Sequence, residues 1–272
     1  MATLHEVRIP TTRADGRPRT LPAALALPDA TAHPSSTDDR PVPGVVVVHE
    51  AFGLSDDIRR IARRFADSGY AALAPDFLAD GAPRFVCMIR FFQGVGRVGS
   101  GQPYRDLTAA REWLASRPEV DADRIGFAGF CVGGGFALLH AASDPDVRVV
   151  APFYAHLPKN DDVLRSVCPV VASYGGQDRS LRGAGARLEK ALTAFGVPHD
   201  VRTYPEAGHS FMNVRTGLSD MIGRLSPLRA TYVETASDDA WRRMLAFFGT
   251  HLAAPAGDAL PATQSASVSA SG

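Results

Sequence analysis

The sequence predicts an α/β protein with a mostly parallel, doubly wound sheet that helices cover on both faces. Short apolar runs rich in β-branched residues, such as GVVVVH at residues 44–49, are typical of strands buried on both faces. Segments with apolar residues at helical spacing separate these runs, and strands that alternate with amphipathic helices form parallel sheets. We expect a single domain over residues 1–252, because α/β domains often reach about 250 residues.

The predicted elements alternate between strand and helix along this domain. The strands are expected at residues 44–49, 71–74, 124–129, 147–152, 169–174 and 201–204. The helices are expected at residues 55–70, 104–116, 132–142, 188–195 and 238–252. In the first helix, Ser55 suits the N-cap, and an apolar face is formed by Ile58, Ile61, Ala62 and Phe65. Functional side chains should follow the strands, because ligands bind at the carboxyl ends of strands in such sheets.

Three segments lack the periodicity of a strand or a helix. Residues 29–43 are polar and proline-rich, which is typical of a surface loop. Residues 81–103 contain several glycines and are a candidate lid or insert near the functional site. Residues 253–272 are rich in Ala, Ser and Pro, so we expect a disordered tail.

The composition excludes several classes of partner. The 29 Lys and Arg residues balance the 29 Asp and Glu residues, whereas a general nucleic-acid binder carries a basic excess. No apolar run approaches the roughly 18 residues of a membrane span. The first residues lack the basic and apolar regions of a secretory signal, and three cysteines do not make a disulfide framework. These features predict a cytoplasmic protein with neither a nucleic-acid nor a membrane partner, and they leave monomer and homodimer open.

The strongest chemical signal is GFCVG at residues 129–133, between a predicted strand and a predicted helix. It follows the G-x-S-x-G pattern of a nucleophile elbow, with Cys131 in the place of serine. A thiol at a helix N-terminus is favoured as thiolate, and the N–H of Val132 would face a developing oxyanion. The alternative for this motif alone is an inert buried cysteine in a glycine-rich turn. Cys87 and Cys168 are expected to be packing residues.

An acid and a histidine follow the cysteine in the order that such an elbow requires. Asp178, in GGQD, directly follows the predicted strand at residues 169–174. His209, in EAGHSF, follows the predicted strand at residues 201–204. Asp178 alone could be a turn residue, and His209 alone could be an ordinary loop histidine. Together with Cys131 they predict a catalytic triad, in which His209 is the general base and Asp178 orients it.

A glutamate ends the first buried strand, in HEAFGL at residues 49–54. A carboxylate in such a place needs a partner or a chemical role, so Glu50 is a candidate catalytic residue. The alternative is a glutamate that pairs with an arginine or caps the next helix. The same loop supplies the second oxyanion donor in folds with a nucleophile elbow, and the N–H of Ala51 is the candidate here.

With these motifs the chain resembles the dienelactone hydrolase family of the α/β-hydrolase fold. The matching pieces are HEAFGL (49–54), APDF (74–77), GFCVGGGFAL (129–138), GGQD (175–178) and EAGHSF (206–211). The resemblance implies cysteine-dependent hydrolysis of an ester or lactone through a thioester at Cys131, without a metal or an organic cofactor. It also implies that Glu50 interacts with the resting thiol.

The chain departs from this family at two positions. Its best-known members hold a substrate carboxylate with two arginines, and the corresponding residues here are Asp80 and Asn213. Neither can make a bidentate cationic clamp. Arg84, Arg90 and Arg215 lie nearby in the sequence. Substrate contacts are expected from Phe52, Arg84, Ser210 and Asn213.

Three other functions are alternatives to an ester or lactone hydrolase. GVGRVG at residues 94–99 matches a dinucleotide-binding motif, but Pro103 disfavours a helix at the preceding residue and no acid follows at a strand end. An acyltransferase or thioesterase would use the same triad with another acyl acceptor. A non-catalytic, ligand-binding member of the fold would have no need of the triad. The absence of an H-E-x-x-H motif disfavours metal-dependent hydrolysis.

Overall fold

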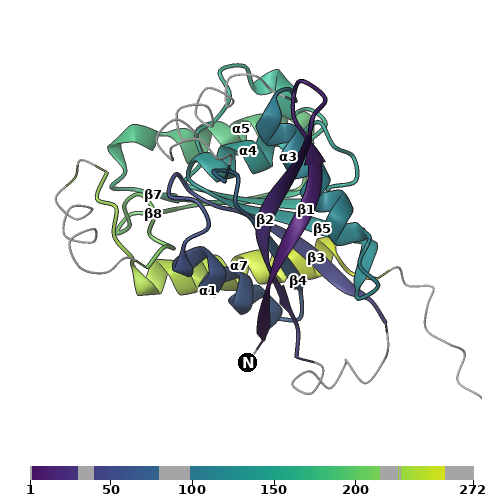
Figure 1. Cartoon of the computed structure of the whole chain (residues 1–272). Helices are drawn as coiled ribbons and strands as arrows, with labels where there is room; N and C mark the ends of the chain where they lie inside the picture. The colour runs from purple at the N-terminus through teal and green to yellow at the C-terminus, as the bar shows by residue number, and fades with distance from the viewer. Residues whose placement is uncertain (1, 30–39, 80–98, 215–225, 227, 255–272) are drawn as a thin grey trace, which may run out of the picture.

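Eight strands form one mixed sheet in the computed structural model, which describes residues 2–29, 40–79, 99–214, 226 and 228–254 (Figure 1). The strands are β1 (Thr3–Thr12), β2 (Pro18–Leu27), β3 (Val42–Val48), β4 (Ala71–Pro75), β5 (Val120–Phe130), β6 (Val149–Phe153), β7 (Val170–Gly175) and β8 (His199–Tyr204). Their order across the sheet is β1-β2-β4-β3-β5-β6-β7-β8. Strands β3 to β8 pair in parallel, whereas β2 is antiparallel to both of its neighbours. The predicted α/β class and the mostly parallel sheet are confirmed.

Helices cover both faces of this sheet, as predicted. The helices are α1 (Asp56–Ala66), α3 (Gln102–Ala115), α4 (Val132–Ala141), α5 (Ala184–Phe195) and α7 (Glu234–His251). Figure 1 shows α1 and α7 on one face, and α3, α4 and α5 on the other. The Phe65 ring of α1 lies 4.7 Å from the Trp241 ring of α7, so these two helices pack on each other as well as on the sheet. Ser55 caps α1 as predicted, since its Oγ accepts from the N–H of Ile58 at 3.3 Å.

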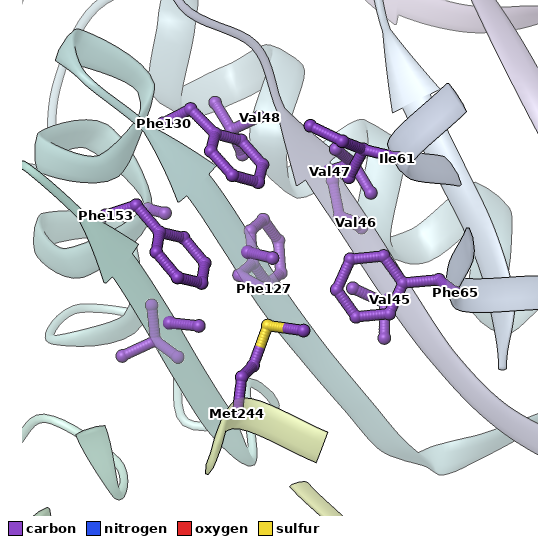
Figure 2. Packing of buried hydrophobic residues seen from close by; sticks show 14 of the residues in the cluster. Val45, Val46, Val47, Val48, Ile61, Phe65, Phe127, Phe130, Phe153 and Met244 are labelled. Atoms are coloured by element: carbon purple, nitrogen blue, oxygen red, sulfur yellow. The ribbon is translucent and has the colours of Figure 1, made fainter. Parts of the chain in front are cut away.

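The core lies between the central strands and these helices (Figure 2). Val45, Val46, Val47 and Val48 of β3 are each completely buried, which explains why this strand is apolar at every position instead of at every second one. The side chains around them include Ile61 and Phe65 of α1, Phe127 and Phe130 of β5, Phe153 of β6 and Met244 of α7. The chain buries this core in the middle of the sheet and leaves the strand ends free to carry polar residues.

The antiparallel pair β1–β2 was not predicted. The pairing runs from Thr3 with Leu27 to Thr12 with Pro18. Only Ile9 of β1 is buried, so this strand lacks the apolar run that identifies a central strand. Strand β2 carries Pro18 and Pro22, which usually argue against a strand. Both elements depend on pairing with their neighbours, and local sequence patterns do not report such pairing.

Several predicted boundaries need correction. Strand β3 begins at Val42, so the loop predicted at residues 29–43 ends earlier, and residues 30–39 lie outside the described chain. Residues 81–98 of the predicted lid and the tail from residue 255 also lie outside it. Helix α3 begins at Gln102 with Pro103 in its first turn, so the expectation that Pro103 disfavours a helix at the preceding residue is wrong. A first-turn proline is tolerated because the N–H it lacks would have no partner within the helix.

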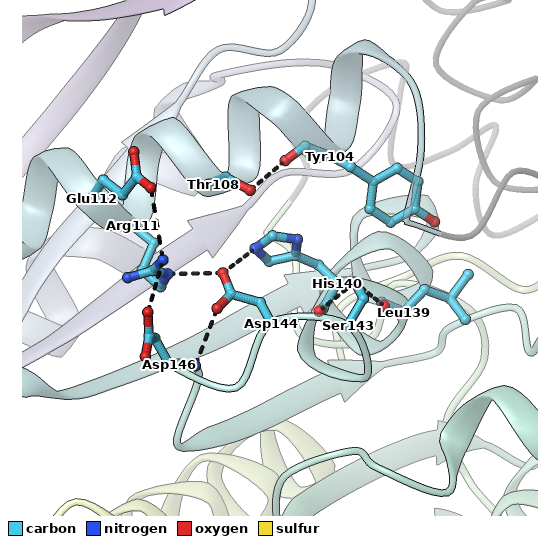
Figure 3. Close-up of polar contacts among 9 residues, drawn as sticks. All are labelled: Tyr104, Thr108, Arg111, Glu112, Leu139, His140, Ser143, Asp144 and Asp146. Carbon is cyan, nitrogen blue, oxygen red and sulfur yellow. Dashed lines mark hydrogen bonds and ion pairs between the residues drawn. The ribbon is translucent and has the colours of Figure 1, made fainter.

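A polar cluster joins α3 to the chain that follows α4 (Figure 3). Arg111 Nε donates to Asp144 Oδ2 at 2.8 Å, and Arg111 Nη2 lies 3.2 Å from Asp146 Oδ2. His140 Nε2 lies 3.2 Å from the same Asp144 oxygen. Burial alone would raise the pKa of Asp144, but the contacts with His140 and Arg111 outweigh it and lower that pKa to about 2. Asp144 is therefore ionised at neutral pH and ties the two helical segments together.

Candidate active site

The predicted nucleophile elbow lies between β5 and α4, at the carboxyl edge of the sheet. Cys131 is the N-cap of α4 and has φ 56° and ψ −121°, a left-handed backbone that non-glycine residues rarely adopt. Its N–H donates to Phe153 O at 3.0 Å, and its carbonyl accepts from the N–H of Gly134 at 3.1 Å. The neighbouring strand and the helix thus hold this strained turn in place.

Two glycines allow the strand and the helix to approach at this turn. A Cβ atom on Gly129 would lie 2.4 Å from Gly133 O, and one on Gly133 would lie 2.3 Å from His49 O. Both contacts are with backbone atoms, which cannot move aside without opening the turn. The close approach also brings the chain after β3, where Glu50 and Ala51 lie, next to the first turn of α4. The G-x-C-x-G pattern is therefore a packing requirement of this elbow.

Three predicted residues from three strand ends lie in one line of hydrogen bonds. His209 Nε2 is 3.0 Å from Cys131 Sγ, and His209 Nδ1 is 2.6 Å from Asp178 Oδ2. The other oxygen of Asp178, Oδ1, accepts from the N–H of Ser180 at 2.9 Å and from its hydroxyl at 2.7 Å. The N–H of His209 donates to Leu228 O at 2.8 Å, which anchors the histidine loop. Because Asp178 accepts at Nδ1, the other ring nitrogen of His209 is the one that faces the thiol.

The same contacts set the charge states of the histidine and the acid. Burial alone would lower the pKa of His209, but Asp178 and Cys131 outweigh it and raise that pKa to about 9. Burial alone would raise the pKa of Asp178, but hydrogen bonds from His209 and Ser180 outweigh it and lower that pKa. At neutral pH the resting site therefore holds an imidazolium between a carboxylate and the sulfur of Cys131. His209 Nε2 thus directs a proton toward the sulfur of Cys131 at 3.0 Å.

The oxyanion-hole candidates lie at the two loops that flank Cys131. Val132 is the first residue of α4, and the first N–H groups of a helix have no partner within it. Ala51 follows Glu50 in the loop after β3, beside the elbow. Glu50 is buried, with 6% of its surface exposed, and its Oε2 accepts from the hydroxyl of Ser210 at 3.2 Å. Ser210 has φ 56°, so the residue after His209 is also held in a left-handed conformation.

The expected substrate contacts have different surroundings. Phe52 is 59% exposed, in the loop that carries Glu50. Ser210 is buried, with its hydroxyl on Glu50. Asn213 is 1% exposed and makes hydrogen bonds at both ends of its amide. Arg84 lies outside the described residues, together with Cys87, Arg90 and Arg215.

Two residues of the site were missed by the sequence analysis. Tyr154 follows β6, is completely buried, and lies with its ring 5.1 Å from the ring of His209. Its place directly after a strand end is the signal that could have found it. Ser180 lies two residues after Asp178 and gives it two hydrogen bonds. A serine at that spacing after an aspartate is common in turns, so its sequence carries no specific signal.

Neither a metal centre nor a membrane span is found in the part of the chain that the structure describes. Among the described residues, His, Cys, Asp and Glu do not gather into a group of three or more that could hold a metal ion. Within the same residues, no helix is long and apolar enough to cross a bilayer.

The sheet order, the elbow after β5 and the order of cysteine, aspartate and histidine after β5, β7 and β8 define an α/β-hydrolase. The chain belongs to the dienelactone hydrolase family, whose family model matches residues 29–252. The protein is accordingly a hydrolase of the ester or lactone type.

Individual relatives agree with this assignment. A protein of Salmonella typhimurium named "Putative carboxymethylenebutenolidase" is 33% identical over 239 residues, which cover 83% of each chain. A protein of the same name from Escherichia coli K12 is 32% identical over 236 residues, or 82% of each chain. The crystal structure titled as that of a "Putative Dienelactone Hydrolase" from Klebsiella pneumoniae is 27% identical, with a TM-score of 0.69, and the match covers 91% of this chain and 99% of that one.

Proposed function

We propose that this protein hydrolyses esters or lactones with Cys131 as the nucleophile, through a thioester intermediate. The observation that supports this most directly is the line of contacts from Cys131 Sγ to His209 at 3.0 Å and from His209 to Asp178 at 2.6 Å. A nucleophile, a base in hydrogen-bond reach and a group that orients the base are the parts that covalent catalysis requires. The substrate class is a small carboxylic ester or lactone, and the acyl acceptor is water.

In the acylation step, the thiolate of Cys131 attacks the carbonyl carbon and forms a C–S bond. The carbonyl electron pair moves to oxygen, and the N–H groups of Val132 and Ala51 stabilise that oxyanion. When the C–O bond breaks, the imidazolium of His209 gives its Nε2 proton to the departing alkoxide. The products are an alcohol, or the opened end of a lactone, and a thioester at Cys131. His209 is left neutral, with Asp178 holding its Nδ1–H tautomer.

In the deacylation step, neutral His209 takes a proton from water while the water oxygen attacks the thioester carbonyl. The C–S bond then breaks, the sulfur of Cys131 leaves as thiolate, and a carboxylic acid is released. The imidazolium and thiolate are restored together, so the cycle needs no external oxidant, reductant or cofactor.

The thioester itself is the test of this proposal. An activated aryl ester mixed with the protein and quenched in acid should leave one acyl group on the peptide that contains Cys131, detected by mass spectrometry. Acylation at another residue, or turnover without any adduct on rapid quenching, contradicts the proposal. A competing alcohol or thiol added to the reaction separates hydrolase from acyltransferase: a hydrolase continues to yield mainly the free acid, and an acyltransferase yields mainly the new ester or thioester.

We further propose that Glu50 lowers the reactivity of Cys131 in the resting site. Its buried carboxylate lies in the loop beside the elbow, and a like charge near a thiol disfavours the thiolate. Glu50→Gln should therefore make alkylation of Cys131 by iodoacetamide faster below neutral pH. Glu206→Gln is the matched control, because Glu206 lies exposed in the loop before His209. If Glu50→Gln leaves the pH profile of alkylation unchanged, Glu50 is a structural residue only.

A further inference from the structure

A chain of side chains, buried except at Asp57, leads from the ring of His209 to the first turn of α1. The Tyr154 ring lies 5.1 Å from the His209 ring, with the two planes at 56°. The hydroxyl of Tyr154 donates to Asn213 Oδ1, and Asn213 Nδ2 donates to Asp57 Oδ2 at 2.8 Å. Asp57 also accepts from Arg60 Nε at 2.8 Å. Tyr154 and Asn213 are almost fully buried, at 0% and 1% exposed.

The chemistry of these groups permits one orientation of the Asn213 amide. A carboxylate such as that of Asp57 can only accept, so the NH₂ end of Asn213 must face it. The carbonyl end then faces Tyr154 and accepts from its hydroxyl. Both polar ends of Asn213 are thus used inside the protein, and the amide acts as a rigid spacer between Asp57 and Tyr154.

The backbone of Tyr154 is held as firmly as its hydroxyl. Its φ of 40° is a conformation that a residue with a side chain rarely adopts, and such strain persists only where the surroundings impose it. Its N–H donates to Ser173 O at 2.7 Å, in the neighbouring strand β7. The residue before it, Phe153, accepts from the N–H of Cys131 and stacks on Phe130 at 5.0 Å. Tyr154 is therefore fixed to the same strand end that holds the nucleophile.

We infer that Asp57, Asn213 and Tyr154 are positioning residues that hold the imidazole of His209 in the plane shared by Cys131 and Asp178. This inference rests on the proposed function. The imidazole must present Nδ1 to the acid and Nε2 to the thiol at once, and a ring packed against its side limits rotation out of that plane. The hydroxyl of Tyr154 does not touch reacting atoms in this role. It locks the position of its own ring through Asn213.

The turn from His209 to Asn213 also contributes to this positioning. The N–H of Asn213 donates to Ser210 O at 2.9 Å, which closes a turn directly after the catalytic histidine. The backbone of this turn therefore fixes the position of His209 through the chain. The side chain of Asn213 fixes it through Tyr154. In this protein Asn213 therefore supports the position of His209 and does not offer a cation to the substrate.

The test compares Tyr154→Phe, which keeps the ring, with Asn213→Leu, which keeps a similar volume but removes both hydrogen bonds. Each should lower kcat for an aryl ester by about tenfold and change KM by less than about twofold, because an imprecise base affects the chemical step more than binding. The double variant should be no slower than the worse single variant, since both remove one shared interaction. The pH profile of Cys131 alkylation should shift in the same variants, because this profile reports the His209–Cys131 contact.

Two further variants separate positioning from a general loss of stability. Tyr204→Phe removes another buried hydroxyl, which donates to Asp239 at 2.9 Å and accepts from Arg243 at 3.1 Å, and it should keep kcat. The exchange Asp57→Asn/Asn213→Asp reverses one hydrogen bond and keeps an acceptor for Tyr154, so it should recover most of the kcat lost in Asn213→Leu. Wild-type kcat in Asn213→Leu, or an equal loss in Tyr204→Phe, overturns the inference. If Cys131→Ala is fully active, the proposed function itself fails, and the two failures are thereby distinguished.

Discussion

Replacement of Cys131 by alanine should lower kcat/KM for aryl esters and lactones by at least about 10³-fold. Without the sulfur, the thioester cannot form, and loss of the nucleophile in triad enzymes removes nearly all of the covalent route. The residual rate would come from the oxyanion hole and from substrate binding, which survive the substitution. Initial rates on a short aryl ester and on an unsaturated lactone, measured with protein of unchanged thermal stability, check this result.

Cys168→Ala is the matched control for that measurement. Burial raises the pKa of the Cys168 thiol to about 12, so this thiol stays protonated and unreactive at neutral pH. It precedes β7 at the opposite end from the strand's catalytic edge, and its loss should leave kcat/KM within about twofold, as is usual away from a reacting group. Iodoacetamide should label Cys131 before Cys168. A Cys131→Ala protein that works within about tenfold of the wild type would exclude the thioester mechanism, because that mechanism assigns the sulfur a loss of several orders of magnitude.

Replacement of Asp178 by asparagine should lower kcat/KM by roughly 10²–10⁴-fold. The analogous change in a serine triad costs about 10⁴-fold, because the amide stabilises the wrong tautomer of the histidine. Here the 2.6 Å contact from Asp178 to His209 Nδ1 both selects the tautomer and holds the charge of the imidazolium. A cysteine is intrinsically more nucleophilic than a serine and depends less on its base, which is why we expect a range that reaches below the serine value.

The pH dependence of kcat/KM should differ between the wild type and Asp178→Asn in a defined direction. The pKa of His209 is raised to about 9, so its imidazolium is present below that pH and is lost as the pH rises through it. Acylation needs this proton for the leaving group, so kcat/KM of the wild type should fall above about pH 9. In Asp178→Asn a contact that raises the pKa of His209 is gone, and the fall should begin at lower pH. An alkaline limb at the same pH in both proteins would contradict the assignment of Asp178.

Ser180→Ala is the graded control for Asp178. It removes the hydroxyl that donates to Asp178 at 2.7 Å but keeps the backbone N–H that donates at 2.9 Å. The carboxylate therefore keeps its charge and most of its orientation. We expect a loss of about threefold to tenfold in kcat/KM, which is less than the full effect of one hydrogen bond to a charged group because the N–H of Ser180 still donates. A loss as large as that of Asp178→Asn would show that both variants disturb the loop, not the charge.

Local sequence patterns were sufficient to predict the elements whose own residues carry the signal. Strand β3 is recognisable because four consecutive valines need burial on both faces, and the elbow is recognisable because Gly129 and Gly133 leave no space for a Cβ atom. The convergence of Cys131, Asp178 and His209 follows from the rule that parallel strands carry their ligands at one edge, because each residue follows such a strand. In each case the physical requirement acts within a few residues of chain, so one stretch of sequence displays it.

The pairing of β1 with β2, the place of Tyr154 and the use of Asn213 required the folded chain. Strand β1 acquires its structure from a partner strand, and its mostly exposed residues show no apolar run. Asn213 forms hydrogen bonds with Tyr154, which lies 59 residues away in the sequence, and with Asp57, which lies 156 residues away. An asparagine has the same appearance in the sequence whether it faces a substrate or a carboxylate of the same chain. Only the packing of distant segments assigns its hydrogen bonds, because their directions depend on atoms that the local chain does not contain.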